Sequence, residues 1–431
     1  MSRILAVSSA ITSKKHAPII YNTNGASGSI GATTTSIQVN FGTSLTAPTT
    51  VGDVMIMPVF LASTSDTVAT PTNWILLHGP IDTAGGGTEM RSYIFWRTYA
   101  LADYAYVDSN GLNLPGKFGN YASTADSSAV SITGDIDIRV RVKLTDWTPS
   151  TTNSLVGKWV TTGNQRSLVL YVIANGKLQF DISTLGSDTV TAQSTVATGG
   201  TDGTQYWVRV TRSSSSGDVK FYFDADGAEP SSWTQLGTTV STAASGIFDS
   251  TATLTIGAIG ASGGGSPTTG IVAQAKLLNG IDGTVAFNAD FTAQSGKWFF
   301  SESSSNAATV TISRAVVLTK TGTNGTSRAG IQLVKMATGI DTSAYNALNG
   351  AADTTPIMPS VTTTALFTTI IGVVCNSGAA VTPATHWVET SDANQIEFSR
   401  MTPVQGGTTT GTFNFTNASN QKWVTFAVAV E

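Results

Sequence analysis

The stretch GDIDIRVRVKL, residues 134–144, decides the fold class. Its aliphatic residues alternate with charged ones, so an extended chain would place the aliphatic side chains on one face and the charges on the other. A strand with one dry and one wet face is typical of an antiparallel sandwich sheet, because parallel sheets bury both faces of their strands. The stretch therefore predicts an all-β domain.

Further short strands are predicted after this stretch, several of them closed by a tight turn. Asn175-Gly176 and Asp226-Gly227 are dipeptides that join antiparallel neighbours in hairpins. The expected strands are residues 168–173, 178–182, 206–211, 219–223 and 254–259.

Residue identities in this region resemble a known family. The matching series includes GNYASTADSSAVSITGDIDIRVRVKLTDWTP (119–149), NQRSLVLYVIANGKLQFDIS (164–183), DGTQYWVRVT (202–211) and GIVAQAKLLNG (270–280). It is similar to the concanavalin A-like, or laminin-G-like, jelly-roll domains of tailed-phage virion proteins. The resemblance implies two curved antiparallel sheets, often with carbohydrate bound at one face or at the loop rim.

The flanks of this region share a second pattern. GDVMI (52–56), TPTNWILL (70–77), FWRT (95–98) and TPATHW (382–387) resemble a β-sandwich module of phage structural proteins. Such modules continue directly after the FWRT-like strand, whereas here the continuation resumes at SRAGIQLVKMATG (327–339). We therefore expect a jelly roll, 106–318, inserted into an antiparallel β-sandwich domain made of 1–105 and 319–431. A pseudo-repeat between the flanks, two packed sheets built alike, and a tandem of three domains stay open.

Composition and apolar runs restrict which partners and which cellular location are expected for the chain. Only 12% of the residues are charged and the net charge is −4, so no basic field attracts nucleic acid. The single cysteine, Cys375, follows an apolar run and is expected to be buried. No apolar run reaches the roughly 20 residues of a membrane span. The run at 4–7 is too short for a signal peptide, which predicts synthesis in a host cytoplasm without export.

A sugar site needs an exposed aromatic platform and polar groups around it, because a pyranose has an apolar face and a polar rim. Trp147 and Trp233 lie in polar, turn-rich surroundings, and Asn164 and Arg166 are expected on a loop. These four residues are the predicted carbohydrate-binding set. The alternative for the two tryptophans is that they close the ends of the sandwich core. The remaining tryptophans considered are expected in cores or as interface anchors: Trp159, Trp207, Trp74 and Trp387.

No catalytic or metal-binding motif is found. The three histidines match no zinc spacing, and the glutamates do not form the Glu-x-Asp-x-x-Glu strand of laminarinase-like jelly-roll hydrolases. Asp135 and Asp137 share a strand face with Arg139 and Arg141, which predicts a solvated, salt-bridged surface. We expect no cofactor, no metal and no enzymatic activity. Calcium at the Asp-Gly turns is the weaker alternative, since Asp-Gly is first a turn signal.

The expected function is that of a non-enzymatic protein on the surface of a phage virion, as a capsid decoration or a fibre component. Its jelly roll would display a lectin-like surface for host or environmental glycans. The partners would be other virion proteins and further copies of the chain, with a trimer expected from fibre precedent. The alternatives are a tail receptor-binding adhesin and, with less support, a polysaccharide-degrading glycoside hydrolase.

Overall fold

The structure of the protein is a computed structural model. It describes residues 19–21, 28–30, 36–40, 53–85, 89–260, 263–322, 327–335, 337, 339–348, 351–365, 367–376, 381–385, 387–392, 396–405 and 409–431.

The chain is all-β and divides into two compact units. The split unit comprises Met1–Thr35, Thr49–Tyr99 and Thr319–Glu431, and the jelly-roll unit comprises Ser36–Pro48 and Ala100–Leu318. The jelly-roll unit thus begins six residues before the expected boundary at 106 and also takes a short earlier segment. No described helix is long and apolar enough to cross a membrane.

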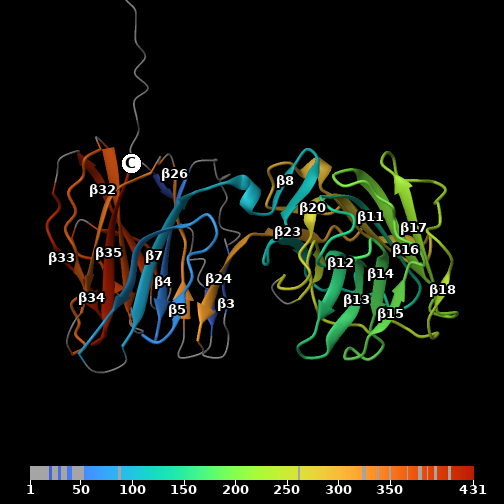
Figure 1. Ribbon diagram of the computed structural model, residues 1–431, viewed down its shortest axis with the longest axis horizontal. Helices are drawn as coiled ribbons and strands as arrows, with labels where there is room; N and C mark the ends of the chain where they lie inside the picture. Colours follow the sequence, from blue (N-terminus) through green and yellow to red (C-terminus); the bar gives the residue numbers. More distant parts are fainter. Residues whose placement is uncertain are drawn as a thin grey trace, which may run out of the picture. The chain divides into compact units, whose positions relative to one another are not determined.

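Two antiparallel sheets form the jelly-roll unit, and Figure 1 shows them as two layers. The β12 sheet has the order β15 (Val190–Gln193), β14 (Leu178–Ile182), β13 (Gln165–Val172), β12 (Asn153–Val160), β19 (Leu254–Ile256), β10 (Tyr121–Thr124), β23 (Thr309–Ser313) and β22 (Phe299–Ser301). The β11 sheet has the order β18 (Val240–Ser241), β17 (Asp218–Ala225), β16 (Gln205–Arg212), β11 (Ile136–Leu144), β20 (Thr269–Asn279), β9 (Gly111–Pro115) and β8 (Tyr106–Asp108), and β21 (Thr284–Asp290) pairs with β20.

The core of this unit lies between the two sheets. The aliphatic residues of β11 that alternate with charges are all fully buried in it, as the sequence predicts. They meet Leu168, Leu170 and Phe180 of the β12 sheet in one hydrophobic cluster. Each such side chain contributes about 1.5–3 kcal/mol on burial, so alternation along one strand fixes which face turns inward.

The split unit also packs one sheet against another. Its first sheet has the order β1 (Ile19–Tyr21), β26 (Gln332–Lys335), β4 (Val54–Leu61), β25 (Ser327–Ala329) and β2 (Gly28–Ile30), with β7 (Arg91–Thr98) on β4 and β6 (Ile75–Asp82) on β7. Its second sheet has the order β27 (Ile340–Ala347), β35 (Trp423–Val430), β29 (Phe367–Asn376), β32 (Ile396–Gln405) and β31 (Val388–Asp392). Because β25 and β26 pair with β4, segments from both sides of the jelly roll share one sheet.

The second sheet of the split unit is buried on both faces. Val373, Cys375 and Phe426 pack toward the first sheet, while Val374, Ala427 and Trp387 belong to a cluster on the opposite face. This explains why β35 is buried at every position rather than at alternate ones. Cys375 is buried as predicted, and burial raises the pKa of its thiol to about 12.

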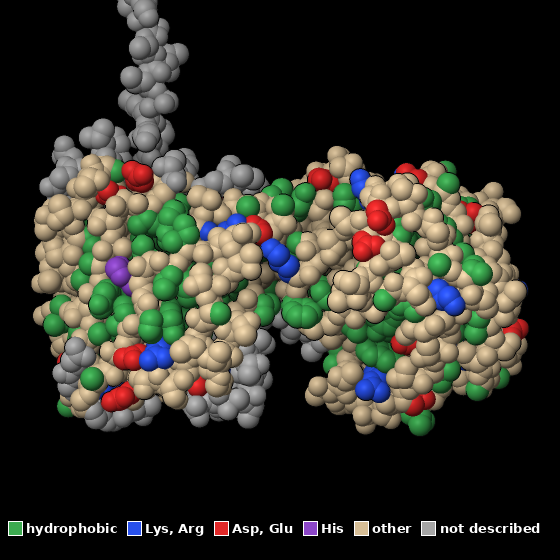
Figure 2. All heavy atoms as spheres, in the orientation of Figure 1, with side chains coloured by type: hydrophobic (Ala, Val, Ile, Leu, Met, Phe, Trp, Pro, Cys, Tyr) green, Lys and Arg blue, Asp and Glu red, His purple; other side chains and the backbone are tan. Residues whose placement is uncertain are grey.

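The shorter elements complete the described chain. They are β3 (Ser36–Asn40), β5 (Thr67–Val68), β24 (Ala315–Thr321), β28 (Ile357–Met358), β30 (Val381–Thr382), β33 (Phe413–Asn414), β34 (Thr416–Asn417) and the 3₁₀ turns η1 (Leu101–Asp103) and η2 (Thr292–Gln294). Figure 2 shows a surface formed mostly by uncharged groups with scattered charges, in keeping with the low charged content of the sequence.

Candidate functional site

The side chains that alternate with the core residues of β11 form the outer face of the β11 sheet. Strand register places neighbours beside each of them. Arg139 lies opposite Arg209 of β16 and Lys276 of β20, whereas Lys143 lies opposite Gln205 and Ile271. The two ends of β11 therefore present different chemistry on the same face.

A covering segment, residues 226–235, folds back from the end of β17 over one part of that face. Glu229 of this segment accepts a hydrogen bond from Nη1 of Arg139 at 2.7 Å and forms an ion pair with Lys276. Burial alone would raise the pKa of Glu229, but the hydrogen bonds from Lys276 and Arg139 outweigh burial and lower it. The covering segment is thus held to the sheet by charge pairs.

Asp137 lies at the centre of the covered part. Its carboxylate is fully buried and accepts hydrogen bonds of 2.7 Å from Nη2 of Arg139 and from Nη2 of Arg209. The salt bridges agree with the prediction from sequence, but the expectation of a solvated surface is wrong here, because neighbouring loops exclude water. Asp135 lies apart from this network and accepts hydrogen bonds from Ser214.

Trp233 belongs to the covering segment and is half-buried. The guanidinium carbons of Arg209 and Arg139 lie 5.2 and 5.6 Å from its ring centroid, within cation–π range. Trp207 meets the same ring edge-on, at 6.0 Å between centroids. Trp207 is buried as expected, but on the outer face under the covering segment rather than in the core between the sheets. Through these contacts Trp233 holds the covering segment against the sheet.

Trp147 is a correction to the predicted sugar site. The side chain is 0% exposed and belongs to the core cluster, so no sugar can stack on it. Its ring lies edge-on to Tyr206 and Phe223, at 5.4 and 5.2 Å between centroids, and Nε1 donates to the carbonyl oxygen of Thr204. Trp147 therefore closes one end of the sandwich core, which was the alternative left open by the sequence.

Asn164 and Arg166 lie on the β12–β13 hairpin. Asn164 is exposed in the turn with a positive φ of 57°, whereas Arg166 is in strand β13 rather than in a loop. The Arg166 guanidinium stacks 5.8 Å from the ring centroid of Trp159 and donates to the carbonyl oxygen of Ser187. Among the described contacts, none joins this hairpin to either predicted tryptophan, so the four residues do not form one site.

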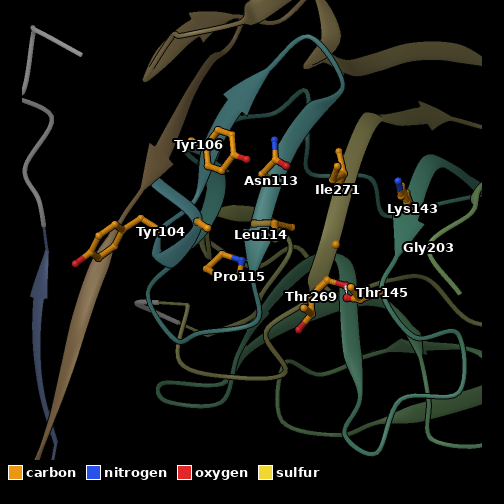
Figure 3. Close-up of a pocket in the computed structure, with 12 residues that line it drawn as sticks. Tyr104, Tyr106, Asn113, Leu114, Pro115, Lys143, Thr145, Gly203, Thr269 and Ile271 are labelled. Carbon is orange, nitrogen blue, oxygen red and sulfur yellow. Dashed lines mark hydrogen bonds between the residues drawn. The ribbon is translucent and has the colours of Figure 1, made fainter. Parts of the chain in front are cut away.

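An open pocket of about 240 Å³ lies over the uncovered part of the β11 sheet. Figure 3 shows its labelled residues on neighbouring strands. Its lining consists of Ala102, Tyr104, Tyr106, Asn113, Leu114, Pro115, Lys143, Thr145, Gly203, Thr269, Gly270 and Ile271.

Strand register explains how this pocket is built. Lys143 of β11 lies opposite Ile271 of β20, Ile271 opposite Asn113 of β9, and Asn113 opposite Tyr106 of β8. These four side chains form a row across four adjacent strands, which Figure 3 displays side by side. We call this set the open row. It places an ammonium, an aliphatic group, an amide and a phenol within one shallow pocket.

Only one member of the open row can be placed from the sequence pattern. Alternation along 136–144 already places Lys143 on the outer face. The other members come from strands separated from β11 by many residues, and their register follows from pairing that the sequence pattern does not specify. No single motif marks Tyr106 or Asn113.

The described residues contain no group of three or more metal-ligating side chains placed to hold an ion. The two glutamates of the jelly-roll unit are engaged elsewhere. Glu229 pairs with cations beneath the covering segment, and buried Glu302 accepts hydrogen bonds from the backbone amides of Asn288 and Ala308. No carboxylate lines the described pocket.

The known proteins that this chain resembles share little sequence with it. No protein-family model matches the chain, and no curated protein sequence matches it. Among solved structures, the CBM40 module of the Ruminococcus gnavus IT-sialidase, bound to α2,3-sialyllactose, is 14% identical with a TM-score of 0.30, covering 38% of this chain and 88% of that one. Mouse laminin α1 domains LG4-5 are 10% identical with a TM-score of 0.29, covering 81% and 85%. Tailspike protein 2 of an Escherichia coli O157:H7 bacteriophage is 12% identical with a TM-score of 0.28, covering 49% and 26%.

Proposed function

We propose that the jelly-roll unit binds carbohydrate at the open row, within a non-enzymatic protein of the virion surface. The observation that carries the binding proposal is the pocket itself. It combines an aromatic ring, an amide and an ammonium on the outer face of the sheet, beside the part that the covering segment overlies. A pyranose presents the complementary surface, an apolar face with a rim of hydroxyl groups.

Each member of the open row has a distinct role in this proposal. The half-buried ring of Tyr106 offers a surface for the apolar face of a sugar. The Asn113 amide donates to the carbonyl oxygen of Gly111, which orients it and leaves Oδ1 to accept from a sugar hydroxyl. Ile271 separates these groups from Lys143 and keeps the floor of the pocket apolar.

The lining of the pocket favours binding over hydrolysis. Glycoside hydrolysis commonly needs two carboxyl groups on either side of the scissile bond. The pocket lining has no aspartate or glutamate. A sugar held there would meet no carboxylic acid and no nucleophilic carboxylate among the lining residues.

The virion setting of the proposal comes from the sequence resemblance to phage modules. Capsid decoration or a fibre is the preferred placement, and a tail receptor-binding adhesin is the second. Quantitative mass spectrometry of purified particles would separate these placements by copy number. Many copies per particle would support decoration, whereas a few would support the adhesin.

A glycan array probed with the full-length chain tests the binding proposal. We expect selective binding that falls at least tenfold in Tyr106→Ala and in Asn113→Ala. Thr161→Ala, an exposed position on the β12–β13 turn of the opposite sheet, is the matched control and should bind normally. Binding that persists in both pocket variants would place the site elsewhere, and an array without any binding to folded protein would overturn the proposal.

A further inference from the structure

The cations on the outer face of β11 differ in how their charge is balanced. Arg139 pairs with Asp137 and Glu229, and Nε of Arg141 lies 2.7 Å from Oδ1 of Asp226. Both arginines thus have carboxylate partners supplied by this sheet or by the covering segment.

Lys143 is the next outward residue on the same strand. Within the described part of the chain, its ammonium has no ion pair and no hydrogen bond, although the side chain is half-buried. The pocket that it lines holds this one cation and no carboxylate. A cation in a half-buried side chain beside an apolar residue gains more from an anionic partner than a fully solvated cation does, because the local dielectric is lower than that of water.

The size and setting of the pocket restrict what the anion belongs to. About 240 Å³ is below the roughly 300–1,000 Å³ of pockets that enclose drug-sized ligands, which suits a single sugar unit. A polyanion such as nucleic acid would need many cations, whereas this chain has a net charge of −4 and the pocket offers one lysine. The neighbouring phenol and amide suit the rest of a sugar ring.

We propose that the open row selects acidic saccharides, with Lys143 holding a carboxylate or sulfate group of the sugar. This inference rests on the proposed carbohydrate-binding function and adds the chemical class of ligand. The ammonium would donate to the anionic group, while Tyr106 and Asn113 hold the ring.

Isothermal titration of the full-length chain with matched sugars tests this selectivity. The probes are pairs of monosaccharides that differ in one acidic group: glucuronic acid against glucose, galacturonic acid against galactose, and sulfated against unsulfated galactose. We expect the acidic member of at least one pair to bind about tenfold to a hundredfold more tightly, the gain typical of a charge-assisted hydrogen bond. Comparing carboxylated with sulfated probes identifies the anionic group.

Variants at the lysine separate charge from packing. Lys143→Met should remove the preference for the acidic member, and Lys143→Arg should retain part of it because the charge is kept. Lys220→Met is the matched control, since Lys220 is exposed on β17 of the same sheet and lies outside the pocket lining. It changes the net charge equally and should leave the preference intact.

The outcomes distinguish the two proposals. Equal affinity for acidic and neutral sugars, both weakened by Tyr106→Ala, would overturn the acidic selectivity and leave carbohydrate binding in place. The absence of binding to every sugar, with the protein folded, would overturn both. Inorganic sulfate that competes as well as the acidic sugar at equal ionic strength would also overturn the inference, since the pocket would then hold a bare anion.

Discussion

Two parts of one sheet face, built on the same strand, differ in what lies over them. Around Arg139 and Arg209, carboxylates come from Asp137, from Asp282 and from the covering segment 226–235, and the two guanidiniums are held in ion pairs of 2.5–2.7 Å. Around Lys143, no described carboxylate approaches and a pocket stays open.

The comparison shows that charge on a strand face does not by itself indicate a binding surface. Where acids match the cations, the polar groups are satisfied and stabilise the packing of a loop on a sheet. Where a cation lacks such a partner, the same alternation leaves a group that a ligand can satisfy. The covered part is therefore structural in this account, and the open row is the candidate site.

The largest loss of stability is expected from a substitution at the centre of the covered part. Asp137→Asn would leave the Arg139 and Arg209 guanidiniums with a neutral partner, because Asp137 lies buried between them. We expect a loss of about 3–5 kcal/mol in the free energy of unfolding, measured by urea denaturation. Asp226→Asn, which removes an exposed partner, should cost less than about 1 kcal/mol. Equal effects of the two substitutions would show that the network is not buried.

Trp233 tests whether the covering segment is structural. Trp233→Ala should lower the free energy of unfolding by about 1–3 kcal/mol, less than the roughly 3–5 kcal/mol expected for the fully buried Trp147→Ala. Sugar binding by the Trp233 variant should be unchanged, because the residue is outside the pocket lining. Lost binding with stability retained would make Trp233 the aromatic platform instead.

Substitutions in the open row should lower the affinity for sugar and leave the stability of the protein unchanged. Tyr106→Phe keeps the ring and removes the hydroxyl, so we expect an affinity within about threefold of the native protein, whereas Tyr106→Ala should lose about tenfold, or about 1.4 kcal/mol. Thermal denaturation would check that both variants fold. Equal losses in the two variants would assign the contribution to the hydroxyl rather than to the ring.

The smallest expected effect is the pH dependence of the stability that Glu229 contributes through the covering segment. The pKa of Glu229 is lower in the folded chain than in the unfolded one, because the hydrogen bonds from Lys276 and Arg139 outweigh the effect of burial. Its stabilisation is therefore present above about pH 4.3 and is lost as the pH falls through the folded pKa. Glu229→Gln should cost about 1 kcal/mol at pH 7 and less toward pH 3, by urea denaturation at both values. A constant difference would contradict the pairing.

The sequence predicted the all-β fold because alternation and turn dipeptides are local signals. Residues 136–144 form a half-buried strand, as their period of two indicates. The prediction for Trp147 was wrong because polar neighbours in sequence do not reveal burial in three dimensions. Its ring lies against Tyr206 and Phe223, which come from two other strands.

The candidate site was harder to predict for the same reason. Trp233 was predicted as part of the sugar site, whereas its contacts with Arg139 and Trp207 depend on a loop that returns over the sheet. The open row joins residues from β8, β9, β20 and β11 through strand register alone. Hydrophobic pattern specifies which face a residue occupies, and pairing specifies its neighbours.

The most direct test of this account is hydrogen exchange of the full-length chain with and without the tightest-binding glycan from the array. We predict slower amide exchange in β8, β9 and the first part of β20, residues 106–115 and 269–272, with little change in the covering segment 226–235. Protection confined to the covering segment, with the open row unchanged, would contradict the assignment of the site.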